Sequence, residues 1–484
     1  MGQTVRQDDT DTSVAARAVR AFEAARGAQP GWASCDPRDR ARPFHTLAHV
    51  LLERRETVLD VIQADTGKAR SHALEELLDA VLSISYYARN AGRLLRPRRR
   101  PGPLPVLSRT TQYAAPLGVV TVITPWNYPL ALAADVVPAL LAGNTVVHKP
   151  DLRTARSSLL LREYAIEAGL EPQVWQPVLG SPDELGDVLI ERADFVSFTG
   201  STAVGRRIAR QCAERLIGCS LELGGKNPMI ILADADLERA VPAAIRACFG
   251  NAGQLCIGIE RIYVDRSIEA EFLRRFVTAT KMLRLGAGTG YIADVGSLIS
   301  AEQLDRVQGA VERAVAAGGR IAAGGRPRPD IGPYVYEPTI ITGATEDSEL
   351  VREEVFGPVV SVQGFSTDAE AVRLANDTPY GLNASVFGRA RRRTRSVATR
   401  LEAGMVNINE GYATGYGSAA PVGGWKESGT GRRHGPDGLL QYTRSQLVAS
   451  QQLLGFDPVA GLSAERYGNL LVTGVKALRR LRIR

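Results

Sequence analysis

The feature that most constrains the fold is a repeated alternation of short strand-like runs with longer helical segments. The strand-like runs lie at residues 110–114, 119–123, 145–149, 195–198, 229–232, 261–264, 359–365, 384–387 and 405–409. The helical segments between them have about 10 to 15 residues, the length that a crossover between parallel strands needs. The alternation therefore predicts βαβ units and an α/β fold with mostly parallel sheets.

The chain is too long for one hydrophobic core. With 484 residues it should form two or three domains. Residues 15–95 are rich in Ala, Leu and charged residues and have helical periodicity, for example over 47–64. The run of Arg and Pro at 96–101 is expected to be a solvated connector. The tail, 453–484, is expected to form at most one amphipathic basic helix, docked or solvated rather than bound to a membrane surface.

Charge and cysteine content exclude several classes of protein. A net charge of +7 and a pI near 9.2 are a mild bias toward anionic ligands, and no nucleic-acid-binding module accompanies them. The five cysteines include no CxxC pair, which argues for a reducing compartment and against a disulfide framework or a metal site. The polar N-terminus and the broken apolar runs predict no secretory signal and no membrane span. We therefore expect a cytoplasmic protein that does not bind nucleic acid.

Cys256 is the strongest candidate for chemistry. It lies in the segment 249–261, FGNAGQLCIGIER, where a Gly-containing turn precedes a strand-like run. A Cys in such a turn can present its sulfur and its backbone N–H to a cavity. A lone Cys is more often an inert buried residue, but four further segments with complementary chemistry favour a nucleophile here.

Two of these segments supply groups for hydrolysis. Glu222, in ELGGKNP at 222–228, is a carboxylate among small residues 34 positions before Cys256. Partial burial would raise its pKa toward the range of a useful general base. Asn127, in PWNYP at 125–129, follows an apolar strand, and its amide can donate to an oxyanion beside the backbone N–H of Cys256.

The other two segments predict a dinucleotide site. FTGSTAVG at 198–205 is typical of a strand, a turn and a helix start, where free N–H groups and the helix dipole hold a pyrophosphate. In EEVFGPV at 353–359, a carboxylate and an aromatic ring two positions later suit a ribose and a nicotinamide. The chain has no GxGxxG fingerprint at its first βα turn, so generic dinucleotide motifs would not reveal this cofactor.

Together these segments resemble the aldehyde dehydrogenase superfamily over residues 15–450. The late segments GMVNIN at 404–409 and PVGGWKESGTGR at 421–432 belong to the same resemblance. It implies an aldehyde dehydrogenase-like α/β fold with two Rossmann-like parallel domains and a small β oligomerisation hairpin. It also implies NAD(P)-dependent oxidation of a small-molecule aldehyde to the acid, through a thiohemiacetal and a thioester.

The resemblance assigns a role to each matching residue. Cys256 is the implied nucleophile, Glu222 the general base and Asn127 the oxyanion donor. The implied cofactor residues are Thr124, Pro125, Trp126, Lys149, Arg153, Gly200, Ser201, Gly205, Leu223, Glu354 and Phe356. Lys149 would bind a ribose, the residues at 200–205 the pyrophosphate, and those at 354–356 the nicotinamide ribose and ring. No metal is implied.

Domain bounds follow from the same resemblance. Residues 1–103 and 121–224 would form the dinucleotide-binding domain, and 225–438 the catalytic domain. Residues 104–120 and 439–452 would supply the oligomerisation strands ahead of the basic tail, 453–484. Because an exposed sheet edge is a liability unless it is paired, we expect a homodimer or homotetramer.

The third position after Lys149 bears on the choice of cofactor. NAD-preferring members of the family carry a Glu there that accepts a hydrogen bond from the adenosine ribose, and this chain has Leu152. Leu152 removes that hydrogen bond and a charge that would repel a 2′-phosphate. Lys149 and Arg153 could then pair with the phosphate, so we expect NADP to be preferred over NAD. In the alternative, Arg153 simply faces water.

Within the family, the chain most resembles actinobacterial succinate-semialdehyde dehydrogenases. The resemblance is carried by the Arg-Pro run with PVL at 105–107 after it, by NEG at 409–411 and by GRRHG at 431–435. Arg433 departs from the family, which has Glu at that position, and this puts a proton relay through a second carboxylate in doubt. In better-known succinate-semialdehyde enzymes, Arg residues that bind the substrate carboxylate occupy the positions of Asp135 and Gly250.

A dicarboxylate product would therefore need some other cation in this chain. Ser418, Thr414 and Arg433 are the candidates for contact with the carboxylate. The alternative is a broad pocket for aliphatic or aromatic aldehydes, with walls from Tyr128, Trp175, Tyr412 and Tyr416. The sequence leaves both substrate classes open.

Two further readings compete with hydrolytic aldehyde oxidation. A CoA-acylating semialdehyde dehydrogenase would pass the thioester to CoA, and such enzymes tend to lack the base that Glu222 supplies. A non-catalytic protein on the same fold is the other, because fold does not fix function. Such a non-catalytic protein would be expected to have lost a reactive residue. This chain keeps all four of Cys256, Glu222, Asn127 and Lys149.

Overall fold

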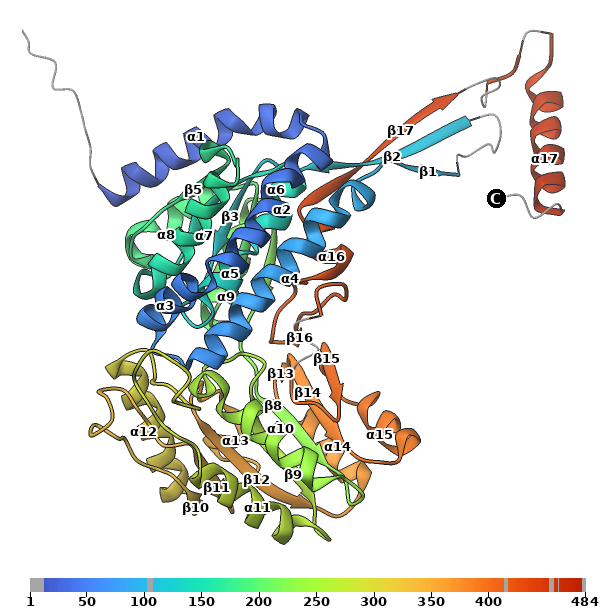
Figure 1. Cartoon of the computed structure of the whole chain (residues 1–484). Helices are drawn as coiled ribbons and strands as arrows, with labels where there is room; N and C mark the ends of the chain where they lie inside the picture. The colour runs from blue at the N-terminus through green and yellow to red at the C-terminus, as the bar shows by residue number, and fades with distance from the viewer. Residues whose placement is uncertain (1–12, 102–107, 413–416, 452–456, 460, 481–484) are drawn as a thin grey trace, which may run out of the picture.

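The computed structural model describes residues 13–101, 108–412, 417–451, 457–459 and 461–480. Two α/β lobes lie one above the other in Figure 1, and a long antiparallel ribbon extends from the upper lobe. Each lobe is built on its own mostly parallel sheet, as the alternation of strand-like and helical segments predicts. The α/β fold class with mostly parallel sheets is therefore confirmed.

A five-stranded parallel sheet forms the upper lobe, in the order β5-β4-β3-β6-β7. Its strands are β3 (Val119–Ile123), β4 (Thr145–Lys149), β5 (Trp175–Pro177), β6 (Phe195–Thr199) and β7 (Gly218–Glu222). The chain runs outward from β3 to β5 and then returns to β6 on the other side of β3. Such a reversal leaves a crevice at the carboxyl ends of the central strands, where open α/β sheets bind ligands.

Helices from both ends of the chain cover this sheet. They are α1 (Val14–Ser34), α2 (Pro37–Glu53), α3 (Arg55–Thr66), α4 (Arg70–Leu94), α5 (Pro129–Ala133), α6 (Val136–Leu141), α7 (Ala155–Glu167), α8 (Pro182–Glu191), α9 (Thr202–Glu214) and α16 (Gly435–Leu440). The helical run predicted over 47–64 is two helices rather than one. Arg54 lies between them with φ −95° and ψ 23°, and the break lets both helices turn apolar residues into one core.

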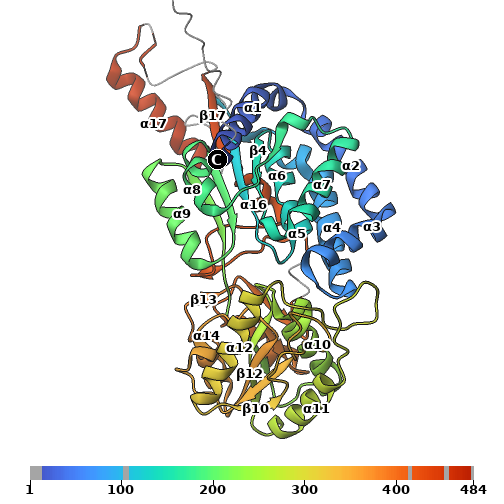
Figure 2. The ribbon, with the colours of Figure 1, turned by 90° about the vertical axis from the view of Figure 1, so that its left-hand side faces the viewer.

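The lower lobe, at the bottom of Figure 2, contains a sheet of seven strands. Their order is β10-β11-β12-β9-β8-β14-β15. Its strands are β8 (Asn227–Ile231), β9 (Ile259–Asp265), β10 (Arg320–Ala323), β11 (Thr339–Thr342), β12 (Val359–Phe365), β14 (Asn383–Phe387) and β15 (Met405–Ile408). Only β10 is antiparallel to its neighbour. The flanking helices are α10 (Leu237–Phe249), α11 (Glu269–Lys281), α12 (Ala301–Ala316), α13 (Glu349–Arg352), α14 (Asp368–Asn376) and α15 (Arg391–Ala398).

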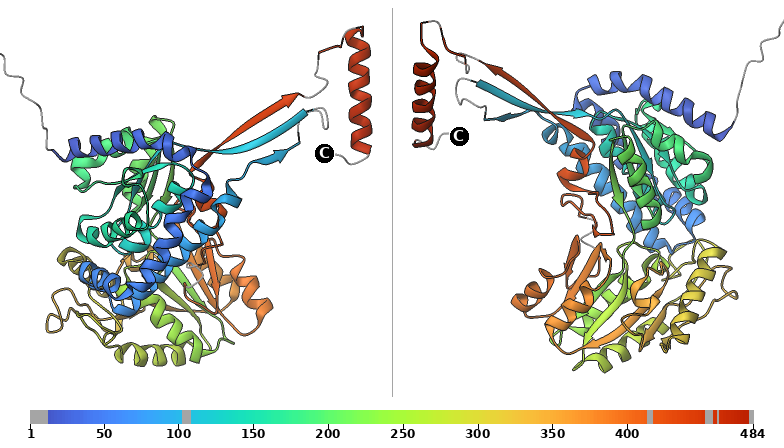
Figure 3. Two further views of the ribbon diagram at one scale, coloured as in Figure 1. Left: turned by 45° about the horizontal axis from the view of Figure 1, so that its top comes forward. Right: turned by 180° about the vertical axis from the view of Figure 1, so that it is seen from behind.

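Two small antiparallel sheets complete the fold. β13 (Tyr380–Gly381) pairs with β16 (Trp425–Lys426). The ribbon, which Figure 3 shows in two views, contains β1 (Arg98–Arg100), β2 (Ser108–Pro116) and β17 (Thr443–Gln451), with β2 in the middle. The interpretation of residues 96–101 as connector alone is wrong, because three of the arginines pair with β2 while staying exposed.

A last helix, α17 (Ala464–Arg480), lies beyond the far end of the ribbon and away from both lobes in Figures 1 and 3. It is the single amphipathic basic helix that the tail sequence predicts, and apart from Tyr467 its residues are exposed or half-buried. No helix in the described part of the chain is long and apolar enough to span a membrane.

Candidate active site

The upper sheet brings several predicted residues to one edge. Asn127 follows β3, Lys149 ends β4, Ser201 follows β6 and Glu222 ends β7. Since these strands are parallel and adjacent, their carboxyl ends face the same side, toward the lower lobe. Residues that are up to 95 positions apart in the sequence therefore line one region.

Asn127 is bonded to the segment that carries Cys256. Its Nδ2 donates to the carbonyl oxygen of Gln254 at 3.1 Å, and its own carbonyl oxygen accepts from Asn251 Nδ2 at 3.2 Å. Asn127 is buried, and its amide has a second N–H for another acceptor. These two hydrogen bonds hold the neutral amide of Asn127 close to the backbone segment that precedes Cys256.

A tight turn presents Cys256. Asn251 and Ala252 both have φ 53°, a left-handed conformation that is uncommon outside Gly. Gly253, with φ 70°, approaches the next loop so closely that a Cβ would lie 2.0 Å from the carbonyl oxygen of Gly357. Asn227 Nδ2 donates to the carbonyl oxygen of Cys256 at 2.7 Å, which fixes the far side of the turn.

The thiol of Cys256 is half-buried, and its surroundings disfavour the thiolate form. Burial raises its pKa to about 12, and Glu354 and Glu222 add to the shift, while Arg433 opposes it. The thiol therefore needs a nearby base before it can attack a carbonyl carbon.

Glu222 has the properties of that base. Its Oε1 is buried without a hydrogen-bond partner among the described residues, so it can accept a proton or a hydrogen bond from a water molecule. Burial raises the pKa of Glu222 to about 8, Arg433 lowers it and Asp135 raises it. A cavity of about 70 Å³ is lined by Glu222, Cys256 and Asn127 together.

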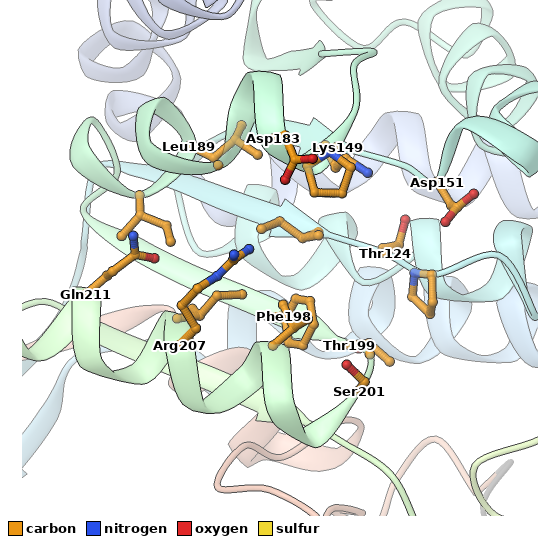
Figure 4. Close-up of a pocket in the computed structure, with 18 of the residues that line it drawn as sticks. Thr124, Lys149, Asp151, Asp183, Leu189, Phe198, Thr199, Ser201, Arg207 and Gln211 are labelled. Carbon is orange, nitrogen blue, oxygen red and sulfur yellow. The ribbon is translucent and has the colours of Figure 1, made fainter. Parts of the chain in front are cut away.

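A larger cavity, of about 570 Å³, lies at the crevice of the upper sheet (Figure 4). Of the predicted cofactor residues, it is lined by Thr124, Pro125, Trp126, Lys149, Arg153, Gly200 and Ser201. Ser201 makes no side-chain cap for α9, which leaves the first N–H groups of this helix available to a phosphate. The size and chemistry of this cavity fit a nicotinamide dinucleotide.

Two glycines shape this crevice by their lack of a side chain. A Cβ on Gly200 would lie 2.5 Å from the Phe198 ring. A Cβ on Gly205 would lie 2.4 Å from the side chain of Leu223, so Gly205 allows α9 to pack closely rather than lining the cavity itself. Leu223 lines the two smaller cavities beside Cys256 instead.

Arg153 and Arg207 differ in their availability to a ligand. Arg153 donates through Nε and Nη2 to the two oxygens of Asp151, both at 2.9 Å. Arg207, on α9, has no ion pair or hydrogen bond with any described residue, and Figure 4 shows its side chain reaching into the cavity. Sequence reasoning missed Arg207; its position one helical turn after Val204, on the same face, is the signal that could have found it.

Glu354 and Phe356 lie on the lower-lobe side of a third cavity, of about 180 Å³, which Cys256 and Asn127 also line. Glu354 Oε1 accepts from the backbone N–H of Gly225 at 3.0 Å, and burial raises the pKa of Glu354 to about 7. The Phe356 ring meets the Trp126 ring edge-on, with centroids 5.4 Å apart. The nicotinamide end predicted from the sequence therefore adjoins the sulfur.

Arg433 is the cation in the wall of the cavity that holds Cys256. Its Nε lies 3.0 and 2.9 Å from the two oxygens of Asp135, and its Nη2 lies 3.9 Å from Asp79. The Arg433 side chain keeps 21% of its surface exposed. Asp79, on α4, lines the same cavity, and no feature of the sequence had indicated it.

Several predicted substrate contacts do not occur. Trp175 lies on β5, an edge strand of the upper sheet, but its side chain is wholly buried in the hydrophobic core beside His148. Tyr412 is buried with its hydroxyl on Glu75 at 2.9 Å. Ser418 is not among the residues that line the cavity, whereas Tyr128 lines it. Thr414 and Tyr416 fall outside the described residues.

The comparisons with known proteins agree with this geometry. Residues 7–448 match the family model described as "Aldehyde dehydrogenase family". A protein of Mycolicibacterium smegmatis with the provisional name succinate-semialdehyde dehydrogenase, NADP(+), is 49% identical over 463 residues, which cover 95% of this chain and 90% of that protein. A Mycobacterium tuberculosis protein with the same provisional name, numbered 2, is 45% identical over 96% of this chain and 90% of its own length.

A solved structure supports the same assignment. Betaine aldehyde dehydrogenase from Staphylococcus aureus in complex with NAD+ has a TM-score of 0.87 and 35% identity, over 92% of this chain and 89% of that chain. The similarity covers both lobes and extends well beyond the residues of the candidate site. The chain belongs to the aldehyde dehydrogenase family.

Proposed function

We propose that this protein oxidises succinate semialdehyde to succinate with NADP as the preferred cofactor. The observation that carries the proposal is that Cys256, Glu222 and Asn127 line one cavity beside a cavity that fits a dinucleotide. The name shared by its mycobacterial relatives supports the choice of substrate and cofactor.

The acylation step uses three groups. The Cys256 sulfur attacks the aldehyde carbon and forms a C–S bond, while Glu222 accepts the thiol proton. The carbonyl oxygen becomes an oxyanion, which the Asn127 side-chain amide and the backbone N–H of Cys256 stabilise. A nicotinamide held beside Glu354 and Phe356 would supply the hydride acceptor for oxidation of this adduct to a thioester.

The second step is hydrolysis. After it has released the thiol proton to solvent, Glu222 removes a proton from a water molecule, and the water oxygen attacks the thioester carbon. The C–S bond breaks and releases the carboxylic acid, and Glu222 returns its proton to the Cys256 sulfur. A carboxylate with a pKa of about 8 is a stronger base than an ordinary Glu, which suits this task at neutral pH. Dividing one difficult oxidation between two easier steps is the gain of covalent catalysis.

The residues around the adenosine end favour NADP. Leu152 has no charge that would repel a 2′-phosphate, and the cations Lys149 and Arg207 both line the cavity. Arg207 is better suited than Arg153, because Arg153 already neutralises Asp151. Asp183 and Asp187 lie on the α8 side of the cavity, and Asp187 accepts from Gln211 at 3.2 Å. A dianionic phosphate would therefore bind toward Lys149 and Arg207.

Arg433 is the group we assign to the substrate carboxylate. It lines the same cavity as Cys256, and its side chain stays partly exposed although its Nε donates to Asp135. The remaining wall is largely apolar, with Leu132, Ile257 and Met405 among its members. This wall favours a short aliphatic chain between the two polar ends of the substrate.

Initial rates with a panel of aldehydes test the proposal. Succinate semialdehyde, butanal and benzaldehyde should each be assayed with NADP and with NAD, against a Cys256→Ser control. We expect the highest kcat/KM for succinate semialdehyde with NADP, free acid as the product, and no turnover by the control. Equal or better rates with butanal would favour the broad-specificity alternative, and a strict need for CoA would favour the acylating one.

We also propose that the chain assembles as a homodimer or as a pair of dimers. The outer strands of the ribbon, β1 and β17, have open edges, and Leu447 and Val448 of β17 are 63% and 49% exposed. Pairing with the ribbon of another copy would satisfy the backbone groups at these edges and cover Leu447 and Val448. Sedimentation equilibrium measures the assembly, and a monomer at micromolar concentration would refute this part of the proposal.

A further inference from the structure

Two buried Lys–Glu ion pairs lie outside the candidate catalytic set, and they have the same construction. Lys68 pairs with Glu76 in the upper lobe, and both side chains are fully buried. Lys226 pairs with Glu260 in the lower lobe, with side-chain exposures of 0% and 8%. In each pair, the carboxylate also accepts hydrogen bonds from two consecutive backbone N–H groups, at the start of α5 for Glu76 and in the Phe356 loop for Glu260.

The first pair holds the loop of Asn127. Lys68 Nζ donates to Glu76 Oε2 at 2.6 Å and to the carbonyl oxygen of Asn127 at 2.6 Å. Glu76 Oε1 accepts from the N–H groups of Leu130 at 2.7 Å and Ala131 at 3.3 Å. The oxyanion donor is thereby fixed at its own carbonyl and again at the start of α5.

A cation–π contact adds to this attachment. The Lys68 ammonium lies 3.9 Å from the centroid of the Tyr128 ring, the residue that follows Asn127. Lys68 thus touches the loop through the backbone of one residue and the side chain of the next.

The second pair holds the loop of Phe356. Lys226 donates to Glu260 Oε2, which also accepts from the N–H of Val355 at 3.0 Å. Glu260 Oε1 accepts from the N–H of Phe356 at 2.9 Å. Phe356 has φ 57°, a conformation that is a genuine outlier for a bulky side chain, so an external attachment is needed to maintain it.

We propose that these two pairs position two different halves of the site, and this inference rests on the proposed function. The Lys68–Glu76 pair sets the oxyanion donor, and the Lys226–Glu260 pair sets the loop that meets the nicotinamide. A buried ion pair adds little net stability over an apolar pair of the same volume, but removing one partner leaves a charge without compensation. The loop bonded to the remaining partner then shifts.

A reaction that needs no cofactor separates the two roles. In the hydrolysis of p-nitrophenyl acetate, the Cys256 sulfur attacks the ester carbonyl, p-nitrophenolate leaves with the bonding electrons, and water then releases acetate from the thioester. This reaction needs Asn127 at the oxyanion but not Phe356 or Glu354. Hydride transfer from an aldehyde adduct needs both loops.

The experiment compares Glu76→Gln with Glu260→Gln, and Lys68→Met with Lys226→Met as a second matched set. Ester hydrolysis without cofactor and single-turnover reduction of NADP are measured for each, with thermal unfolding to record stability. We expect variants of the first pair to slow both reactions by roughly 10- to 100-fold. Variants of the second pair should slow NADP reduction to a similar degree and leave ester hydrolysis within about twofold of the unchanged enzyme.

Because both pairs are buried and alike, a general loss of packing would affect the two sets equally. Equal loss of ester hydrolysis in both sets, or unchanged ester hydrolysis in the first set, would overturn the inference. If the unchanged enzyme oxidises no aldehyde, the proposed function fails instead. The two failures are therefore distinguishable.

Discussion

Asp135 and Arg433 form a partly buried ion pair across 298 positions of sequence, and Arg433 lines the cavity that holds Cys256. The Arg433 Nε lies 3.0 and 2.9 Å from the two oxygens of Asp135. Better-known succinate-semialdehyde dehydrogenases carry Arg at the position of Asp135, and the wider family has Glu at the position of Arg433. In this chain the signs of both positions are exchanged, so a cation still faces the site.

Replacing Arg433 should therefore affect carboxylated substrates most. The Arg433→Gln change alone would leave Asp135 buried without a counter-charge, so we would combine it with Asp135→Asn. We expect the double variant to lower kcat/KM for succinate semialdehyde roughly 10- to 100-fold, the usual worth of a hydrogen bond to a charged group. The value for butanal should change by less than about threefold, and an equal loss for both aldehydes would contradict the assignment.

Asn127→Ala should slow acylation while leaving binding nearly unchanged. Loss of one oxyanion donor typically costs about 100- to 1,000-fold in kcat. Pre-steady-state release of p-nitrophenolate measures the step directly, and Asn90→Ala on α4 serves as a surface control. A variant with normal acylation would show that the amide faces away from the oxyanion.

The hydrolytic step should depend on pH through Glu222. Its pKa is raised to about 8 by burial, and only the deprotonated carboxylate can activate water. The deacylation rate should therefore rise with pH and level off above pH 8, with a value at pH 6 about 50-fold below that at pH 8. Rapid-quench measurements on the acetylated enzyme test this, and a rate independent of pH would exclude Glu222 as the base.

The same shift links Glu222 to stability. A carboxyl group whose pKa is higher in the folded state contributes stability that is fully present below its unfolded value, 4.5, and is lost as pH rises through about 8. Glu222→Gln has no such titration. The melting temperature of the unchanged protein, measured relative to that of Glu222→Gln, should thus fall by a few degrees between pH 5 and pH 9, and a constant difference would contradict the burial of this charge.

Arg207→Ala should weaken NADP binding but not NAD binding. Loss of a charge-assisted hydrogen bond to the 2′-phosphate corresponds to about tenfold in Kd. Isothermal titration of each cofactor measures it without turnover, and Arg153→Ala provides a matched control on the same cavity. A larger effect from Arg153→Ala would return the phosphate contact to the residue that the sequence favours.

The sequence predicts the local parts of this molecule well and the long-range parts less so. The run at 359–365 coincides with β12, because an apolar strand between polar turns depends on neighbouring residues alone. In the broad-specificity alternative, Trp175 is a wall of the substrate pocket. The residues next to it in the sequence do not indicate on which side of the sheet its side chain lies. The contacts of Arg433 with Asp135, and of Lys68 with the Asn127 loop, join distant segments and needed the fold to be found.

The break between the two sheets falls inside one short motif. Glu222 is the last residue of β7 in the upper sheet, and Asn227 is the first of β8 in the lower one. The sulfur belongs to the lower lobe and the base to the upper, so their separation is set by how the lobes rest on each other. A change far from both atoms that tilts one lobe would then alter the distance between the base and the sulfur. The segment that joins the two sheets, from Glu222 to Asn227, includes the base itself.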